Sequence, residues 1–174
     1  EIGSVTDPDV SGGTLFSRPV AAFGSVWVVN DQQVVRIDPA TMSVVAHIDI
    51  PGSTVEIGSA WVSDITASTD GVWALSHAPG DVAAVRIDPA TNQIAQQISL
   101  GANARAIGVA AGSLWAVHRF TDQPPAVDDS LSRYDLTTGE ELARIEFSSD
   151  FEPGLVIGDD TDVWVNGMKW AGEA

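Results

Sequence analysis

Four tryptophans occur in nearly the same local sequence, and this repeat restricts the chain to a small set of folds. Trp27 is preceded by Gly-Ser-Val, Trp73 by Asp-Gly-Val, Trp115 by Gly-Ser-Leu and Trp164 by Thr-Asp-Val. Successive tryptophans are 46, 42 and 49 residues apart. Self-similarity at a period of about 20–50 residues is typical of architectures that use one supersecondary unit per repeat.

A second phrase recurs between the tryptophans. Residues 35–41 (Val-Arg-Ile-Asp-Pro-Ala-Thr) are identical to residues 85–91, and residues 132–139 are a diverged third copy. Apolar residues alternate with Arg36 and Asp38, which predicts a half-buried strand. The Asp-Pro-Ala-Thr that follows predicts a β-turn, because proline sets φ at the second position and the aspartate side chain caps the turn.

Together the two phrases predict a four-stranded antiparallel meander. The first unit has strands expected at 20–23, around Trp27, at 34–38 and at 44–50, and no segment has a helical period. Meanders repeated at this spacing are the blades of a β-propeller, and a tryptophan at a fixed place packs between blades. We therefore predict an all-β chain that forms one domain, a β-propeller of four-stranded antiparallel blades over 1–174.

The repeat also predicts where the blades lie. Three complete blades are expected at 17–50, 64–100 and 105–147, and half of a fourth at 155–174. Residues 1–16 would complete the fourth blade, because residues 2–8 resemble a third strand that runs into an Asp-Pro turn. A blade shared between the termini removes edge strands. The propeller has four blades if the chain closes alone; a homodimer or a longer parent chain with more blades stays open.

Composition and net charge limit the classes of partner that the chain can bind. The chain is 44% hydrophobic and 18% charged, which is typical of a globular protein. A net charge of −16 predicts repulsion from nucleic acid and from anionic membranes. No apolar run is long enough to cross a bilayer, so no membrane insertion is expected. The absence of cysteine excludes disulfides and thiol chemistry.

The repeats carry a family resemblance. The sequence resembles the YVTN/NHL-type bacterial β-propellers, including the streptogramin-lyase-like group, in residues 24–30, 34–41, 85–92 and 133–140. The resemblance implies a propeller with a binding funnel at one face, in a sensor or scaffold that is extracellular or attached to the cell surface; a cytoplasmic location stays open. The lyase members are magnesium-dependent enzymes that use histidine. This chain has no lyase active-site motif, so no catalytic residue is transferred to it.

Arginines and aromatic residues outside the repeat are the first candidates for a site. Arg18, Arg105 and Arg119 are expected in loops at the funnel face, where guanidinium groups would bind a carboxylate or a phosphate. Trp61 and Phe120 are expected in long loops at the same face, where exposed aromatic rings suit a ligand or a partner surface. The alternative is chance placement of the arginines and local burial of the rings.

Polar residues at the ends of the second strands are the other candidates. They are His77, His118, Asn30 and Asn166, which follow the repeated tryptophans by two to four residues. We expect these side chains to ring the mouth of the central channel, where they would bind a ligand. Ordinary polarity at strand ends is the competing explanation.

These residues lead to one main hypothesis about function. The chain is a non-catalytic β-propeller that binds a protein partner or a small, anionic ligand at its funnel face. The first alternative is a metal-dependent lyase or hydrolase that uses His77 or His118 with a divalent ion, although nothing in the sequence requires a cofactor or a metal. The second alternative is a structural segment of a larger surface protein.

Overall fold

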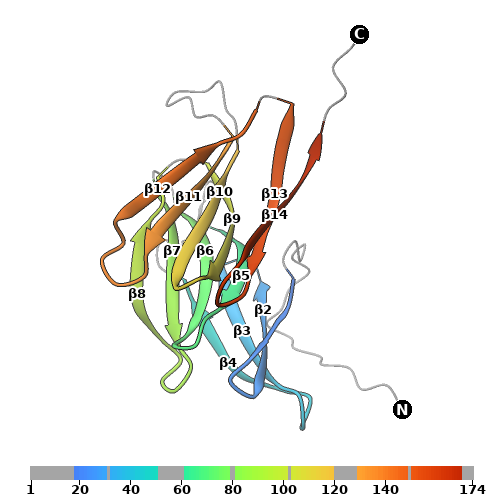
Figure 1. Cartoon of the computed structure of the whole chain (residues 1–174). Helices are drawn as coiled ribbons and strands as arrows, with labels where there is room; N and C mark the ends of the chain where they lie inside the picture. The colour runs from blue at the N-terminus through green and yellow to red at the C-terminus, as the bar shows by residue number, and fades with distance from the viewer. Residues whose placement is uncertain are drawn as a thin grey trace.

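The computed structural model describes residues 18–30, 32–50, 61–78, 81–101, 103–119, 129–148 and 150–169. These residues form 14 strands in four antiparallel sheets, with no helix among them (Figure 1). The first sheet contains β1 (Val20–Ala22), β2 (Ser25–Asn30), β3 (Gln33–Asp38) and β4 (Ser43–Asp49). The second contains β5 (Trp61–Ala67), β6 (Val72–Ala78), β7 (Asp81–Asp88) and β8 (Gln93–Ser99). The third contains β9 (Ala104–Ala110), β10 (Ser113–His118), β11 (Ser130–Asp135) and β12 (Glu141–Glu146). The fourth contains β13 (Phe151–Gly158) and β14 (Val163–Lys169).

The predicted all-β class is confirmed, and the order of strands is that of the predicted meander. In each of the first three sheets the strands pair in chain order, and the fourth sheet has the first two strands only within the described residues. This repeated antiparallel structure is consistent with a β-propeller-like fold. In the described part of the chain, no helix is present that could cross a membrane.

The Asp-Pro phrase forms the turn between the third and fourth strands. Asp38 Oδ1 accepts the N–H of Ala40 at 2.7 Å, and Asp88 Oδ1 accepts that of Ala90 at 2.8 Å. These backbone hydrogen bonds lower the pKa of both carboxyl groups. Four residues after each aspartate, Met42 and Asn92 have φ of 53° and 57°. A left-handed residue at this place ends a hairpin loop with a bulge, which explains the register shift that recurs in each third strand.

The tryptophan face of the first sheet packs against the second sheet, and that of the second sheet packs against the third. Trp27 belongs to a buried cluster with Val72 and Ala74 of the second sheet. Trp73 belongs to a second cluster with Leu114 and Ala116 of the third sheet. The repeated tryptophan therefore joins one sheet to the next, as the sequence predicts.

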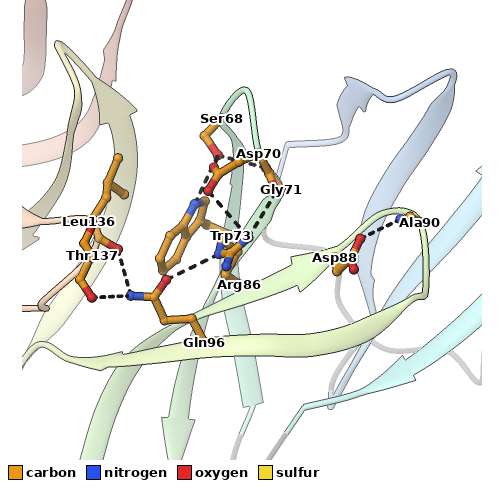
Figure 2. Close-up of polar contacts among 10 residues, drawn as sticks. All are labelled: Ser68, Asp70, Gly71, Trp73, Arg86, Asp88, Ala90, Gln96, Leu136 and Thr137. Carbon is orange, nitrogen blue, oxygen red and sulfur yellow. Dashed lines mark hydrogen bonds and ion pairs between the residues drawn. The ribbon is translucent and has the colours of Figure 1, made fainter.

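Side chains of a third strand and of a fourth strand also hold one sheet to the turn of the next. Arg36 Nη1 donates to the carbonyl oxygen of Pro89 at 2.6 Å and to Asn92 Oδ1 at 2.9 Å. Gln96 Nε2 donates to the carbonyl oxygens of Leu136 at 2.7 Å and Thr137 at 3.3 Å (Figure 2). These contacts cross from the first sheet to the second and from the second to the third.

The first strands of the four sheets lie around one small cavity. β5 lies against β9, and β9 lies against β13. The cavity has a volume of about 290 Å³, and residues 18–20, 65–67, 108–109 and 156–158 line it. The first and fourth sheets therefore face the same central space.

Candidate functional site

Most of the predicted site residues lie at one end of the sheets, which we call the polar end. At this end β1, β5 and β9 begin and β2, β6 and β10 end. Residues of the polar end are Arg18, Asn30, Trp61, His77, Arg105, His118 and Arg119. Antiparallel pairing of first and second strands brings the start of one to the end of the other. The candidate site is described below from the side chains that the second and third sheets place at the polar end.

Two first strands carry a β-bulge at the polar end. In β5, Val62 pairs with Ser76 and Asp64 with Leu75, which leaves Ser63 as the extra residue. In β9, Ala104 pairs with His118 and Ala106 with Val117, which leaves Arg105 as the extra residue. A bulge bends the strand and re-aims a side chain. Ser63 and Arg105 are thus the displaced residues of two neighbouring first strands.

His77 is buried in β6 and is held next to Ser63. Its imidazole Nε2 lies 2.7 Å from Ser63 Oγ, and the residue is 6% exposed. Burial is the main cause that lowers the pKa of His77 to about 4, and the positive charge of Arg105 lowers it further. His77 is therefore neutral at pH 7, and it interacts through hydrogen bonds rather than as a cation.

His118 faces the same space between the second and third sheets. It lies on the same face of β10 as Leu114 and Ala116, which pack against the second sheet. Its Nε2 lies 3.5 Å from the Tyr134 hydroxyl, which donates to the carbonyl oxygen of Leu100 at 3.1 Å. On the other side, His77 pairs with Val82, which packs in that cluster too. The two histidines thus lie on facing surfaces of one interface.

The structure corrects the expected positions of two residues. Trp61 and Arg105 were expected in loops, but Trp61 is the first residue of β5 and Arg105 is the second residue of β9. Both loops end earlier than their composition indicates, because pairing with β6 and β10 extends the first strands toward the polar end. Phe120 lies outside the described residues.

The other arginines are near carboxylates. Arg119 forms an ion pair with Glu152 of β13. Arg18 lies close enough to the buried carboxylate of Asp64 that its charge lowers the pKa of Asp64, although burial dominates and the net shift is upward. The three arginines therefore do not act as one cationic cluster, and Arg105 is the one whose charge lowers the pKa of His77.

The two asparagines do not join the histidines. Asn166 lies in the middle of β14 rather than at the end, and its Oδ1 accepts the N–H of Leu155 at 2.6 Å. Asn30 ends β2 and is 7% exposed; within the described residues its Oδ1 is a buried side-chain atom without a hydrogen-bond partner. It lies in the first sheet, apart from the interface that holds His77 and His118.

Sequence reasoning missed Ser63 and Glu152. Ser63 falls just before the second blade expected at 64–100, and bulges depend on the register of paired strands, which a single sequence does not reveal. Among the described residues, no group of three or more histidine, aspartate and glutamate side chains converges in a way that could hold a metal ion.

Comparisons with known proteins relate the chain to a fold. No protein-family model matches it, and no curated protein matches it. Among solved structures it is similar to hydrazine synthase of Kuenenia stuttgartiensis, with a TM-score of 0.58 and 17% sequence identity. The match covers 74% of this chain and 36% of that chain. Similarity at this level concerns the arrangement of the sheets alone.

Proposed function

We propose that the four sheets are blades of a β-propeller and that the polar end between the second and third sheets binds a small anionic ligand without catalysis. The repeated inter-sheet tryptophans and the common cavity of the first strands support the propeller. The binding hypothesis rests on the environment of Arg105.

Arg105 differs from the arginines that pair with carboxylates and from Arg36 and Arg133, which hydrogen-bond to Ser25 and Ser113 and lie over Trp27 and Trp115. Arg86, Arg119 and Arg144 form ion pairs with Asp70, Glu152 and Glu141. Arg105 is exposed and makes no ion pair with any described residue. In a chain with a net charge of −16, a guanidinium without a carboxylate favours an external anion.

Ser63 and His77 supply neutral hydrogen-bonding groups at the same end of the sheets, where the charge of Arg105 lowers the pKa of His77. The hydroxyl and the imidazole already share a hydrogen bond, so one of them keeps a donor or acceptor for a ligand. Because the imidazole is uncharged at pH 7, Arg105 provides the net charge of the site. A bound anion would offset the charge of Arg105 and raise the pKa of His77.

Titration with phosphate and with citrate, followed by NMR shifts of the His77 ring, tests the proposal. We expect saturable binding that Arg105→Ala weakens by about tenfold or more, because a charge-assisted hydrogen bond contributes about 1.5–3 kcal/mol. Arg144→Ala is the matched control, since Arg144 is paired with Glu141 on β12. Equal binding by both variants, or no saturable binding at all, would refute the site.

One contact favours the enzyme alternative. A serine hydroxyl at 2.7 Å from a neutral imidazole has the geometry of a nucleophile with its base. Hydrolysis of an activated nitrophenyl ester, lost in both Ser63→Ala and His77→Gln, would support that function. Hydrolysis that Ser63→Ala leaves unchanged would not come from this serine and histidine, and the non-catalytic proposal would stand.

A further inference from the structure

Three arginines occupy equivalent positions in the third strands of the first three sheets. They lie directly opposite the repeated tryptophans, in the pairs Arg36 with Trp27, Arg86 with Trp73, and Arg133 with Trp115. A guanidinium group can donate from Nε on its edge and from Nη1 and Nη2 at its end. The three arginines therefore show what the end of the group binds when its surroundings differ.

In the first two sheets, oxygen atoms of the protein occupy the end of the guanidinium. Nη1 of Arg36 donates to the carbonyl oxygen of Pro89 at 2.6 Å and to Asn92 Oδ1 at 2.9 Å. Nη1 of Arg86 donates to the carbonyl oxygen of Asp70 at 3.1 Å and lies 3.5 Å from Asp70 Oδ2 (Figure 2). Each of these arginines thus has one main-chain oxygen and one side-chain oxygen at Nη1.

Arg133 is anchored like Arg36, but the end of its guanidinium is open. Its Nε donates to Ser113 Oγ at 2.8 Å, as Nε of Arg36 does to Ser25 Oγ. The group lies 5.8 Å from the centroid of the Trp115 ring, and Ser113 is 1% exposed. In the part of the chain that the structure describes, no hydrogen bond or ion pair reaches Nη1 or Nη2 of Arg133. The protein therefore fixes this guanidinium and leaves its two end nitrogens without an acceptor.

The surface beside Arg133 is apolar. Arg133 pairs with Ala143 of β12, and Leu131, two residues earlier, pairs with Ile145. Paired residues and residues two apart share one face of a sheet, so Ile145 lies on the same face as Arg133. Its side chain is 53% exposed. Diagonal neighbours across two strands are within reach of long side chains, so one ligand can contact both residues.

We propose that this face of the third sheet binds a small monocarboxylate with an apolar tail. The carboxylate would accept from Nη1 and Nη2 of Arg133, because its two oxygens match the planar end of a guanidinium. It carries a single negative charge, so a chain of net charge −16 opposes it less than it opposes a phosphate dianion. The tail would lie over Ile145 and remove apolar surface from water.

This carboxylate site is separate from the polar end. Trp115 packs in a cluster with Val163 of the fourth sheet. His118 is on the opposite face of β10, with Leu114, which packs against the second sheet. The carboxylate site and the anion site of the polar end can therefore be tested separately, and either can fail alone.

Titration of the whole chain with hexanoate, acetate and phosphate, followed by the NMR shift of the Trp115 indole N–H, tests the site. We expect saturable binding of hexanoate, weaker binding of acetate and still weaker binding of phosphate. Arg133→Lys keeps the charge but removes the planar pair of donors, and it should weaken hexanoate binding by about tenfold. Arg86→Lys is the matched control and should leave binding unchanged, because Asp70 already occupies the end of Arg86.

A second variant separates the tail from the carboxylate. Ile145→Ser should weaken hexanoate binding several-fold and leave acetate binding unchanged, because only hexanoate has a tail to cover the isoleucine. An equal effect on both ligands would overturn the position of the tail. Hexanoate binding should persist in Arg105→Ala, and its loss there would place the carboxylate at the polar end instead.

The remaining outcomes also decide the question. Phosphate binding tighter than hexanoate binding would overturn the class of ligand. Unchanged binding in Arg133→Lys, an equal loss in Arg86→Lys, or no saturable binding of hexanoate would overturn the site. If Arg133→Lys fails to fold, the NMR shift of the Arg133 Nε–H in the unsubstituted chain replaces it. A shift that saturates with hexanoate is expected, and its absence overturns the proposal.

Discussion

The second and fourth sheets use the same tryptophan in opposite surroundings. Trp73 is 0% exposed between the second and third sheets, whereas Trp164 is 52% exposed on β14. Each tryptophan follows a turn and a valine, and each is the second residue of its strand to pair with a first strand. The local sequence therefore determines the strand, and the next sheet determines the burial. Stability should concentrate where a following sheet is present.

The largest expected effect is the loss of a buried tryptophan. Trp73→Ala should lower the free energy of unfolding by about 3–5 kcal/mol, because it leaves a cavity between two sheets. Trp164→Ala should lower it by less than about 1 kcal/mol, since half of that ring is already in water. Urea unfolding of both variants measures the contrast, and equal losses would break it.

The next effect depends on pH. Burial lowers the folded-state pKa of His77 to about 4, while the unfolded value is near 6.5. Between these values the unfolded chain binds a proton that the folded chain does not, so stability falls as pH falls through this window. The full effect is about 3 kcal/mol. His77→Gln should flatten the dependence, and a slope unchanged from that of the unsubstituted chain would contradict the burial of His77.

A buried carboxylate joins the second sheet to the third. Asp64 Oδ2 accepts the N–H of Ile107 at 3.0 Å. The third sheet has no such carboxylate, because Ala106 holds the place of Asp64 there. Asp64→Ala should cost about 1–3 kcal/mol, because it leaves a buried N–H without an acceptor. Asp64→Asn keeps one acceptor and should recover part of the loss. Hydrogen exchange of the Ile107 amide measures the link directly; unchanged protection in the alanine variant would rule it out.

The smallest effect concerns the contact between an outer strand and the next turn. Gln96→Ala removes the hydrogen bonds to Leu136 and Thr137 and should cost about 1 kcal/mol. Gln97→Ala is the control, since Gln97 is exposed and adjacent. Chemical unfolding distinguishes them, and a cost for Gln97 equal to that for Gln96 would show that the turn contact contributes nothing.

Strands and turns could be predicted because each depends on a few neighbouring residues. The strand around Arg36 and the Asp38-Pro39 turn are local, and the structure confirms both. The predicted half-buried alternation is wrong, because the strand lies between two sheets and neighbouring Val34 and Val35 are both buried. The loops before Trp61 and Arg105 were drawn too long because pairing with the next strand decides where a first strand begins. Tertiary pairing in this way overrides local composition.

The candidate site was predicted only in part. His77 and His118 were found from their place after the tryptophans, and the structure puts both at the interface of the second and third sheets. The pairing of Arg119 with Glu152 and the contact of Ser63 with His77 join segments far apart in sequence. Such contacts follow from register and bulges, which the repeat does not encode.

Hydrogen exchange of β14 tests most directly whether the N-terminal residues complete the fourth sheet, as the sequence predicts. It is measured in the whole chain and in a chain that lacks residues 1–17. We predict that β14 amides are protected in the whole chain and exchange rapidly after truncation. Amides of β6 serve as the internal control and should stay protected in both chains. Unchanged exchange of β14 after truncation, with β6 protected, would contradict closure by the chain's own N-terminal residues.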